Sequence, residues 1–182
     1  TSISELLLSG GDPLSLATAK LNSLTEQLAR LKHIKRLRFH TRLPIVLPER
    51  IDDEFIAWLK ALPFQLVFVL HANHANELDG SVMEAVHRIK GAGATVLNQS
   101  VLLKGVNDHT AALVALSERL FACGILPYYL HQLDKVEGAT HFEVPLAQAK
   151  RMHAEMMAQL PGYLVPKLVQ EIAGQSHKTP IV

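Results

Sequence analysis

Length, composition and charge exclude several classes of protein. The chain has 182 residues, 48% of them hydrophobic, so it can bury a full core and one domain is the default expectation. No apolar run reaches the roughly 18 residues that cross a bilayer. With 18 Lys and Arg against 17 Asp and Glu, the net charge of +1 gives no general attraction to nucleic acid or to a membrane surface.

Short apolar runs alternate with helical patterns along the chain. The runs at 3–8, 36–39, 65–70, 95–97 and 125–130 predict strands, and their continuous apolar character is typical of strands covered on both faces. Helices are predicted around Leu21 to Leu31, after a capping Asp52, after a capping Ser81, after 107–108 and from about Pro145. This alternation predicts an α/β fold with a parallel sheet, either open or closed into a barrel.

Each predicted strand ends in a polar cluster, and the clusters recur at nearly constant spacing. The markers Ser9, His40, His71, Gln99 and His131 lie 31, 31, 28 and 32 residues apart, about the length of one strand-helix unit. Ligands of parallel α/β sheets bind at the carboxyl ends of the strands, so these clusters predict one shared site. The alternative is that Gly10 and Gly11, which follow Ser9, form only a tight turn and that the histidines cap strands or bind core carbonyls.

The cysteine content bears on the cellular compartment of the protein, and the first residues bear on whether a further segment precedes them. The only cysteine, Cys123, excludes a disulfide within the chain and suits a reducing compartment, so we expect a cytoplasmic protein. Its place at the end of an amphipathic helix predicts a small packed side chain. The chain starts directly in a predicted strand without an initiating Met, and we expect an N-terminal portion to precede it.

Several longer motifs resemble the lysine 2,3-aminomutase family of radical S-adenosylmethionine enzymes. They are the segments 3–14, 41–48 and 98–108; the segments 127–131, 141–142, 162–167 and 178–180 resemble the subgroup that acts on elongation factor P. The resemblance implies a partial (β/α) radical-SAM-type barrel over 1–160 and a C-terminal cofactor-binding segment over 161–182. It also implies an isomerase that converts (S)-α-lysine to (R)-β-lysine by radical 1,2-amino migration.

The resemblance assigns S-adenosylmethionine to the strand-end clusters. The residues implied to bind this cofactor are Ser9, Gly10, Gly11, Asp12, Arg42, His71 and Gln99. The two glycines permit close backbone approach, and the Asp12 carboxylate can accept hydrogen bonds from an ammonium group. Arg42 is a candidate for a carboxylate contact, and pairing with Glu49 or Asp52 is its alternative.

Three charged residues are implied to serve the substrate and a second cofactor. Asp134 and Glu171 would hold the side-chain amine of lysine, although each could instead pair with Lys135 or Lys167. The better known lysine mutases have Asp where Glu171 stands, which leaves the substrate geometry open. Lys178 would carry pyridoxal 5′-phosphate through a Schiff base, and a solvated lysine in a tail is its alternative.

The resemblance also implies a [4Fe-4S] cluster held by three cysteines at Cys-x3-Cys-x2-Cys spacing. Cys123 cannot supply that set, so this segment is expected to hold no cluster metal, and the ligands are expected in the missing N-terminal region. The expected partners are lysine and the elongation factor P pathway, with no nucleic acid and no membrane; a homo-oligomer is a compatible state.

Other functions stay open from the residues alone. One is an aminomutase acting on another amino acid such as glutamate, and another is a non-catalytic remnant. A third is a metal-dependent barrel hydrolase that uses His71 and His74 with His131 or His141. A basic run at 32–38 is either a solvated helix end or an aid to docking a protein substrate.

Overall fold

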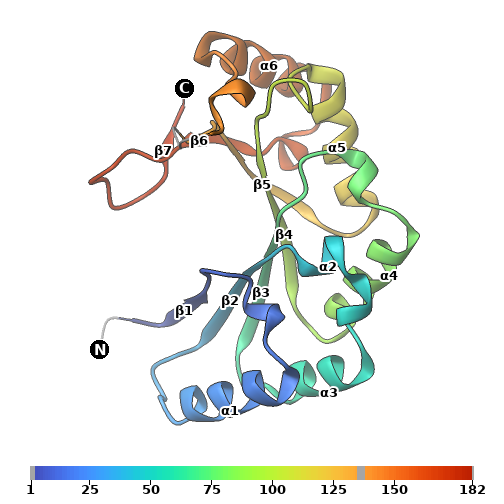
Figure 1. Ribbon diagram of the computed structural model, residues 1–182, viewed down its shortest axis with the longest axis vertical. Helices are drawn as coiled ribbons and strands as arrows, with labels where there is room; N and C mark the ends of the chain where they lie inside the picture. The colour runs from blue at the N-terminus through green and yellow to red at the C-terminus, as the bar shows by residue number, and fades with distance from the viewer. Residues whose placement is uncertain (1–2, 135–137, 182) are drawn as a thin grey trace. The chain divides into compact units, whose positions relative to one another are not determined.

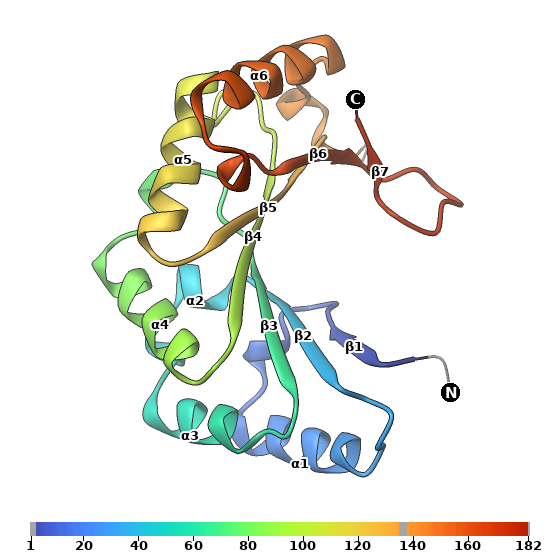
Figure 2. The same cartoon turned by 180° about the vertical axis from the view of Figure 1, so that it is seen from behind.

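The computed structural model describes residues 3–134 and 138–181 (Figures 1 and 2). Contacts divide the chain into two compact units, the first formed by 1–71 and 79–97 and the second by 72–78 and 98–182. Among the described residues, the strands lie in the sheet in chain order from β1 to β7. No helix in the described ranges is long and apolar enough to span a membrane.

The first unit contains three parallel strands and the helices that pack on them. Its strands are β1 (Glu5–Leu8), β2 (Arg36–Thr41) and β3 (Gln65–Leu70), followed by the start of β4 (Thr95–Val101). Its helices are α1 (Thr18–Ala29), the short α2 (Leu43–Val46), α3 (Asp53–Ala61) and α4 (Gly80–Gly91). β1 pairs with β2 and β2 with β3, all parallel, as the apolar runs predict.

An aromatic cluster forms the core of the first unit. Phe39 of β2, Phe68 of β3 and Phe55 of α3 are fully buried, and the rings of Phe39 and Phe68 stack with centroids 4.9 Å apart. Trp58 Nε1 donates to Thr25 Oγ1 at 3.1 Å, which joins α3 to α1 where the two helices lie side by side (Figures 1 and 2). This core packs β2 and β3 against α3.

Helix starts in the first unit confirm one predicted cap and correct another. Asp52 caps α3, since its Oδ1 accepts the Phe55 N–H at 2.7 Å. The prediction that Ser81 caps the next helix is wrong. Asp79 Oδ1 accepts the N–H groups of Ser81 and Val82 instead, so α4 begins at Gly80. A carboxylate two residues upstream satisfies these free N–H groups and leaves Ser81 inside the helix.

The second unit contains the rest of β4 and three further strands. They are β5 (Leu126–His131), β6 (Lys167–Gln170) and β7 (Thr179–Pro180), with α5 (Thr110–Ala122) and α6 (Leu146–Gln159) packed on them. β5 and β6 are parallel, whereas β7 is antiparallel to β6. Leu113, Leu130, Met152 and Leu168 belong to its buried core.

The last hairpin was not predicted and it positions the chain end. Gln170 lies opposite Thr179 in the antiparallel register of β6 and β7. The residues just outside that pair, Glu171 and Lys178, therefore face each other at the base of the loop. In Figures 1 and 2 this loop projects from β6 and returns to it. The parallel α/β class is confirmed, and the separate cofactor segment over 161–182 stays a prediction.

Candidate active site

A glycine turn follows β1 in the first unit. Gly10 and Gly11 have φ values of 87° and 54°, a region that favours glycine, so both positions need the residue found there. Ser9 precedes them and is exposed. The turn thus has the backbone freedom expected of a ligand-binding loop, and its contact with S-adenosylmethionine stays a prediction.

Asp12 ties that turn to the end of β2. Its carboxylate accepts hydrogen bonds from Leu14 N–H (3.0 Å), Thr41 Oγ1 (2.6 Å), Arg42 N–H (2.6 Å) and Leu43 N–H (3.2 Å). A carboxylate offers about four lone-pair sites, so these bonds use its ordinary capacity. A ligand ammonium at Asp12 would have to share an oxygen with one of these donors.

The other two predicted cofactor residues of the first unit lie at strand ends. Arg42 is exposed and directly precedes α2, while His71 is half-buried after β3. The His71 and His40 rings meet edge to face with centroids 6.2 Å apart. Asp52, one alternative partner for Arg42, uses Oδ1 to cap α3. Both cofactor roles remain predictions.

Polar residues within β4 form a buried network with the backbone that follows β3 in the second unit. Asn98 Oδ1 accepts the Ala72 N–H at 2.9 Å, Asn98 Nδ2 donates to the Ala72 carbonyl at 3.0 Å, and Ser100 Oγ donates to the same carbonyl at 2.9 Å. The side chains of Asn98 and Ser100 therefore support the loop backbone. Gln99 lies between them, 9% exposed, and its predicted contact with S-adenosylmethionine is not tested by this network.

Asn107 extends this network and was missed as a structural residue. Fully buried, it accepts the Leu103 N–H at 2.7 Å and donates to the carbonyls of Asn73 (2.8 Å) and Val101 (2.9 Å). Asparagine side chains often bond loop backbone, and Asn107 lies two residues after Gly105, but this placement does not predict its burial. The network holds the loops that surround the strand ends of this unit.

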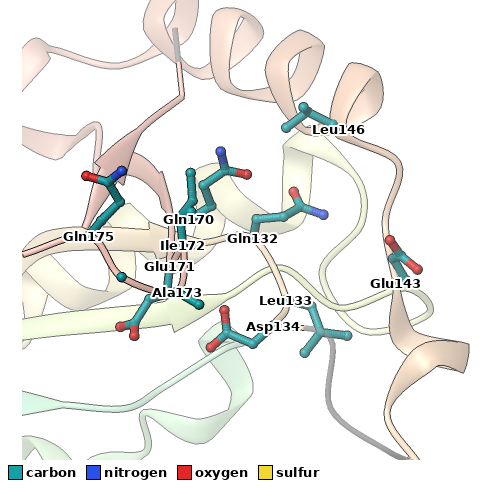
Figure 3. Close-up of a pocket in the computed structure, with 11 residues that line it drawn as sticks. Gln132, Leu133, Asp134, Glu143, Leu146, Gln170, Glu171, Ile172, Ala173 and Gln175 are labelled. Carbon is teal, nitrogen blue, oxygen red and sulfur yellow. The ribbon is translucent and has the colours of Figure 1, made fainter. Parts of the chain in front are cut away.

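An acidic cavity of about 910 Å³ lies beside the ends of β5 and β6 (Figure 3). It is lined by Gln132, Leu133, Asp134, Glu143, Leu146, Gln170, Glu171, Ile172, Ala173, Gly174 and Gln175. Figure 3 shows Asp134 on the segment after β5, Glu171 on the segment after β6 and Glu143 on the segment before α6. The structure therefore brings the two predicted substrate residues, Asp134 and Glu171, to one cavity.

Glu171 and Lys178 form an ion pair at the base of the last hairpin. The Lys178 Nζ donates to Glu171 Oε1, and this hydrogen bond and the lysine charge lower the pKa of Glu171. The Lys178 Nζ also lies 5.8 Å from the centroid of the Tyr129 ring. Lys178 is thus not a solvated tail lysine, and Glu171 pairs with it rather than with Lys167. The alternative pairing of Asp134 with Lys135 lies outside the described residues.

The surroundings of Lys178 suit an aldehyde cofactor that carries a phosphate. A second cavity, of about 240 Å³, is lined by Glu171, Ile172, Gln175, Ser176, His177 and Lys178. It offers one amine, one hydroxyl and one imidazole within a single loop, and Gly174 turns the loop with a φ of 84°. These groups fit pyridoxal phosphate chemically, since an amine is needed for attachment and donors are needed for the phosphate.

Cysteine and histidine residues supply no metal site among the described residues. Cys123 is fully buried, and burial raises the pKa of its thiol although Arg119 acts in the opposite direction. The prediction of a small packed cysteine is confirmed. The described ranges contain no group of three His, Cys, Asp or Glu side chains that could hold a metal ion, so the proposed histidine set of a hydrolase is not assembled there.

Comparisons with known proteins place the chain among radical SAM folds. The chain is similar to a radical SAM methyltransferase from Sphaerobacter thermophilus (TM-score 0.64, 18% identity, 93% of this chain and 52% of that one). It is also similar to SuiB from Streptococcus suis bound to S-adenosylmethionine (TM-score 0.62, 15% identity, 93% and 40%). At these identities the likeness shows the fold alone, and the fold is that of radical SAM proteins.

Sequence similarity gives the more specific relationship. The chain is 49% identical to the L-lysine 2,3-aminomutase of Haemophilus influenzae over 97% of its length, and 46% identical to that of Escherichia coli over 98%. Both alignments cover 52% of the relative, so the chain spans about half the length of the curated relatives it matches. No family model matches the chain. These similarities confirm the resemblance to the lysine 2,3-aminomutase family.

Proposed function

We propose that the intact protein is an isomerase that converts (S)-α-lysine to (R)-β-lysine by radical 1,2-amino migration. We further propose that the product serves the modification of elongation factor P in the cytoplasm. The observation that carries the proposal is that Asp134, Glu171 and Lys178 lie on the walls of two adjoining cavities, which share Glu171. The names of the relatives, L-lysine 2,3-aminomutase, support the aminomutase part of the proposal.

The charge of the larger cavity favours lysine over glutamate as the substrate. Asp134, Glu143 and Glu171 contribute three carboxylates to its lining. An ammonium group about 4 Å from one carboxylate gains on the order of 1 to 4 kcal/mol of Coulomb energy near a protein surface, before the loss of its hydration. A substrate side-chain carboxylate would meet repulsion of the same order. The acidic lining therefore supports the assignment of Asp134 and Glu171 to the side-chain amine of lysine.

Lys178 is proposed to hold pyridoxal phosphate by covalent attachment through its amine. When bound, this cofactor supplies a conjugated system that can delocalise an unpaired electron. The Ser176 hydroxyl and the His177 imidazole are the proposed donors to its phosphate, and both line the cavity that contains Lys178. Tyr129 keeps the Lys178 side chain near the strand β5.

S-adenosylmethionine is proposed to bind Ser9, Gly10, Gly11 and Asp12, with contacts from Arg42, His71 and Gln99. The positive φ angles of the two glycines support close approach of a ligand to this turn. The residues of this chain do not supply a [4Fe-4S] cluster, because Cys123 is its only cysteine and is buried in the core. We propose that the cluster ligands belong to the rest of the intact protein.

The activity is tested with the intact protein, reconstituted without oxygen with iron, sulfide, pyridoxal phosphate and S-adenosylmethionine. Chiral chromatography is expected to detect (R)-β-lysine made from lysine and no β-isomer made from glutamate. Asp134→Asn is expected to lower kcat/KM about 10- to 100-fold, because a hydrogen bond to a charged group is lost. Asp53→Asn changes an exposed acid that pairs with Arg88 and serves as the matched control. Absence of β-lysine would refute the activity.

The pathway is tested separately in cells. Deleting the gene is expected to remove the β-lysyl mass from elongation factor P, as measured by mass spectrometry of the purified factor. Complementation with the Lys178→Ala variant is expected to leave the factor unmodified. A fully modified factor in the deletion strain would overturn the pathway assignment while leaving the isomerase activity to be judged by its own assay.

A further inference from the structure

We infer that Glu171 serves two cations in turn, Lys178 while the protein lacks its aldehyde cofactor and the side-chain ammonium of the substrate once Lys178 is attached to that cofactor. The inference rests on the proposed function and adds an order of events to it. Glu171 then acts as a positioning residue for Lys178 before it acts on the substrate.

The hairpin register makes the first pairing a consequence of the fold. Gln170 and Thr179 are partners in the β6–β7 ladder, and Glu171 and Lys178 are the next residues outward. The strand pairing alone therefore brings Glu171 and Lys178 together, whatever conformation the loop between them adopts. It is partly open to solvent, with 55% of the Glu171 side chain and 26% of the Lys178 side chain exposed. An exposed pair of this kind is weak enough to exchange partners.

The position of Glu171 allows the second pairing. Glu171 lines both the cavity of about 910 Å³ and the cavity of about 240 Å³, whereas Lys178 lines only the smaller one. Asp134 lines the larger cavity together with Glu171. Glu171 lies where the two cavities adjoin. A rotation of its side chain would thus move its carboxylate away from Lys178 and toward Asp134, where the substrate ammonium is proposed to bind.

Charge balance fixes the order in which the two cations are served. One carboxylate neutralises one ammonium, so a substrate amine entering before cofactor attachment would compete with Lys178 for Glu171. On attachment, the Lys178 ammonium would release one proton to solvent, its nitrogen would form the double bond to the aldehyde carbon, and the aldehyde oxygen would leave as water with the other two hydrogens of the amine. Lys178 would then no longer carry the free ammonium that pairs with Glu171. The carboxylate is then available to the substrate.

Tyr129 gives the Lys178 ammonium a second contact, besides Glu171, before the cofactor is attached. The Lys178 Nζ lies within about 6 Å of the ring centroid, the range over which an aromatic face attracts a cation. The ring belongs to β5, which pairs with β6, so this contact comes from the sheet itself rather than from the loop. Before attachment, Lys178 is therefore held by Glu171 from the hairpin and by Tyr129 from the sheet.

The test measures binding of radiolabelled L-lysine by equilibrium dialysis to the intact protein stripped of pyridoxal phosphate. Lys178→Gln is expected to tighten binding about two- to fivefold, the factor that corresponds to one exposed ion pair. Lys167→Gln removes the same charge from β6 without removing the partner of Glu171, and no change is expected there. The double variant Lys178→Gln with Glu171→Gln is expected to lose the gain.

Two outcomes would overturn the inference. If Lys178→Gln binds lysine no more tightly than the parent protein, or if Lys167→Gln gains as much, Glu171 is not the exchanged group. If either binding result is found while the reconstituted enzyme from the same preparation makes β-lysine, only this inference is refuted and the proposed function stands. If no variant binds lysine and the enzyme makes no β-lysine, the proposed function falls as well. NMR titration gives a second measurement, in which the pKa of Glu171 is expected to rise in Lys178→Gln.

Discussion

Replacing Asn107 by alanine tests the polar network that holds the loops after β3 and β4. The change removes one hydrogen bond accepted from Leu103 N–H and two donated to the carbonyls of Asn73 and Val101. Asn107 is fully buried, so water does not readily replace these bonds. The three backbone groups would then be left without their partner.

The expected loss of stability follows from those three bonds. At about 1 kcal/mol each, they predict a decrease of about 3 kcal/mol in the free energy of unfolding. That is a large part of the roughly 5 to 15 kcal/mol that stabilises an ordinary domain. With an m-value of about 2 kcal/mol per molar urea, the unfolding midpoint would fall by about 1.5 M.

Urea unfolding followed by circular dichroism measures the effect, and hydrogen exchange of the Leu103 amide reports it locally. The matched control is Asn22→Ala in α1, where an exposed asparagine donates to Glu26 and alanine is the better helix former. The control is expected to stay within about 0.5 kcal/mol of the parent. Equal midpoints for Asn107→Ala and Asn22→Ala, with the Leu103 amide still protected, would refute the reasoning.

Three further predictions concern the site. Because the pKa of Glu171 is lowered, its pair with Lys178 contributes fully to stability above the ordinary glutamate pKa, and this contribution is lost as the pH falls through the folded-state pKa. NMR of the Lys178 side chain should follow this loss, and the pH-dependent change should be absent in Glu171→Gln. Gly10→Ala should lower stability by about 1 kcal/mol in thermal melts because of its positive φ, and Gly162→Ala should not. Asp12→Ala should lower stability by about 2 to 4 kcal/mol, and an unchanged melting temperature would contradict its bonding role.

Apolar periodicity predicted most of the fold because burial sets both the period and the length of an element. The strand predicted at 65–70 is β3, and the others differ from their predictions mainly at the ends. β6 and β7 were missed. Pro166 interrupts the apolar run before β6, and β7 has only the pair Thr179–Pro180, which is too short to show any period.

The site was less accessible to sequence reasoning because contacts between distant residues decide it. Asp134 was predicted to lie just beyond a strand, whereas Glu171 came only from the family resemblance, because β6 was not predicted; the structure places both on one cavity. The pairing of Glu171 with Lys178 did not follow, because it depends on the register of a hairpin that the pattern does not reveal. Likewise, no local signal distinguishes a buried Asn107 from an ordinary loop asparagine.

The β6–β7 hairpin also affects how this region can evolve. Glu171 and Lys178 adjoin the last paired residues of the ladder, whereas the residues at 172–177 form the loop between them. Insertions or deletions at the tip would change the shape of the smaller cavity without separating the two ends. Selection could therefore adjust the surroundings of a bound molecule there while the spacing between acid and amine remains constant.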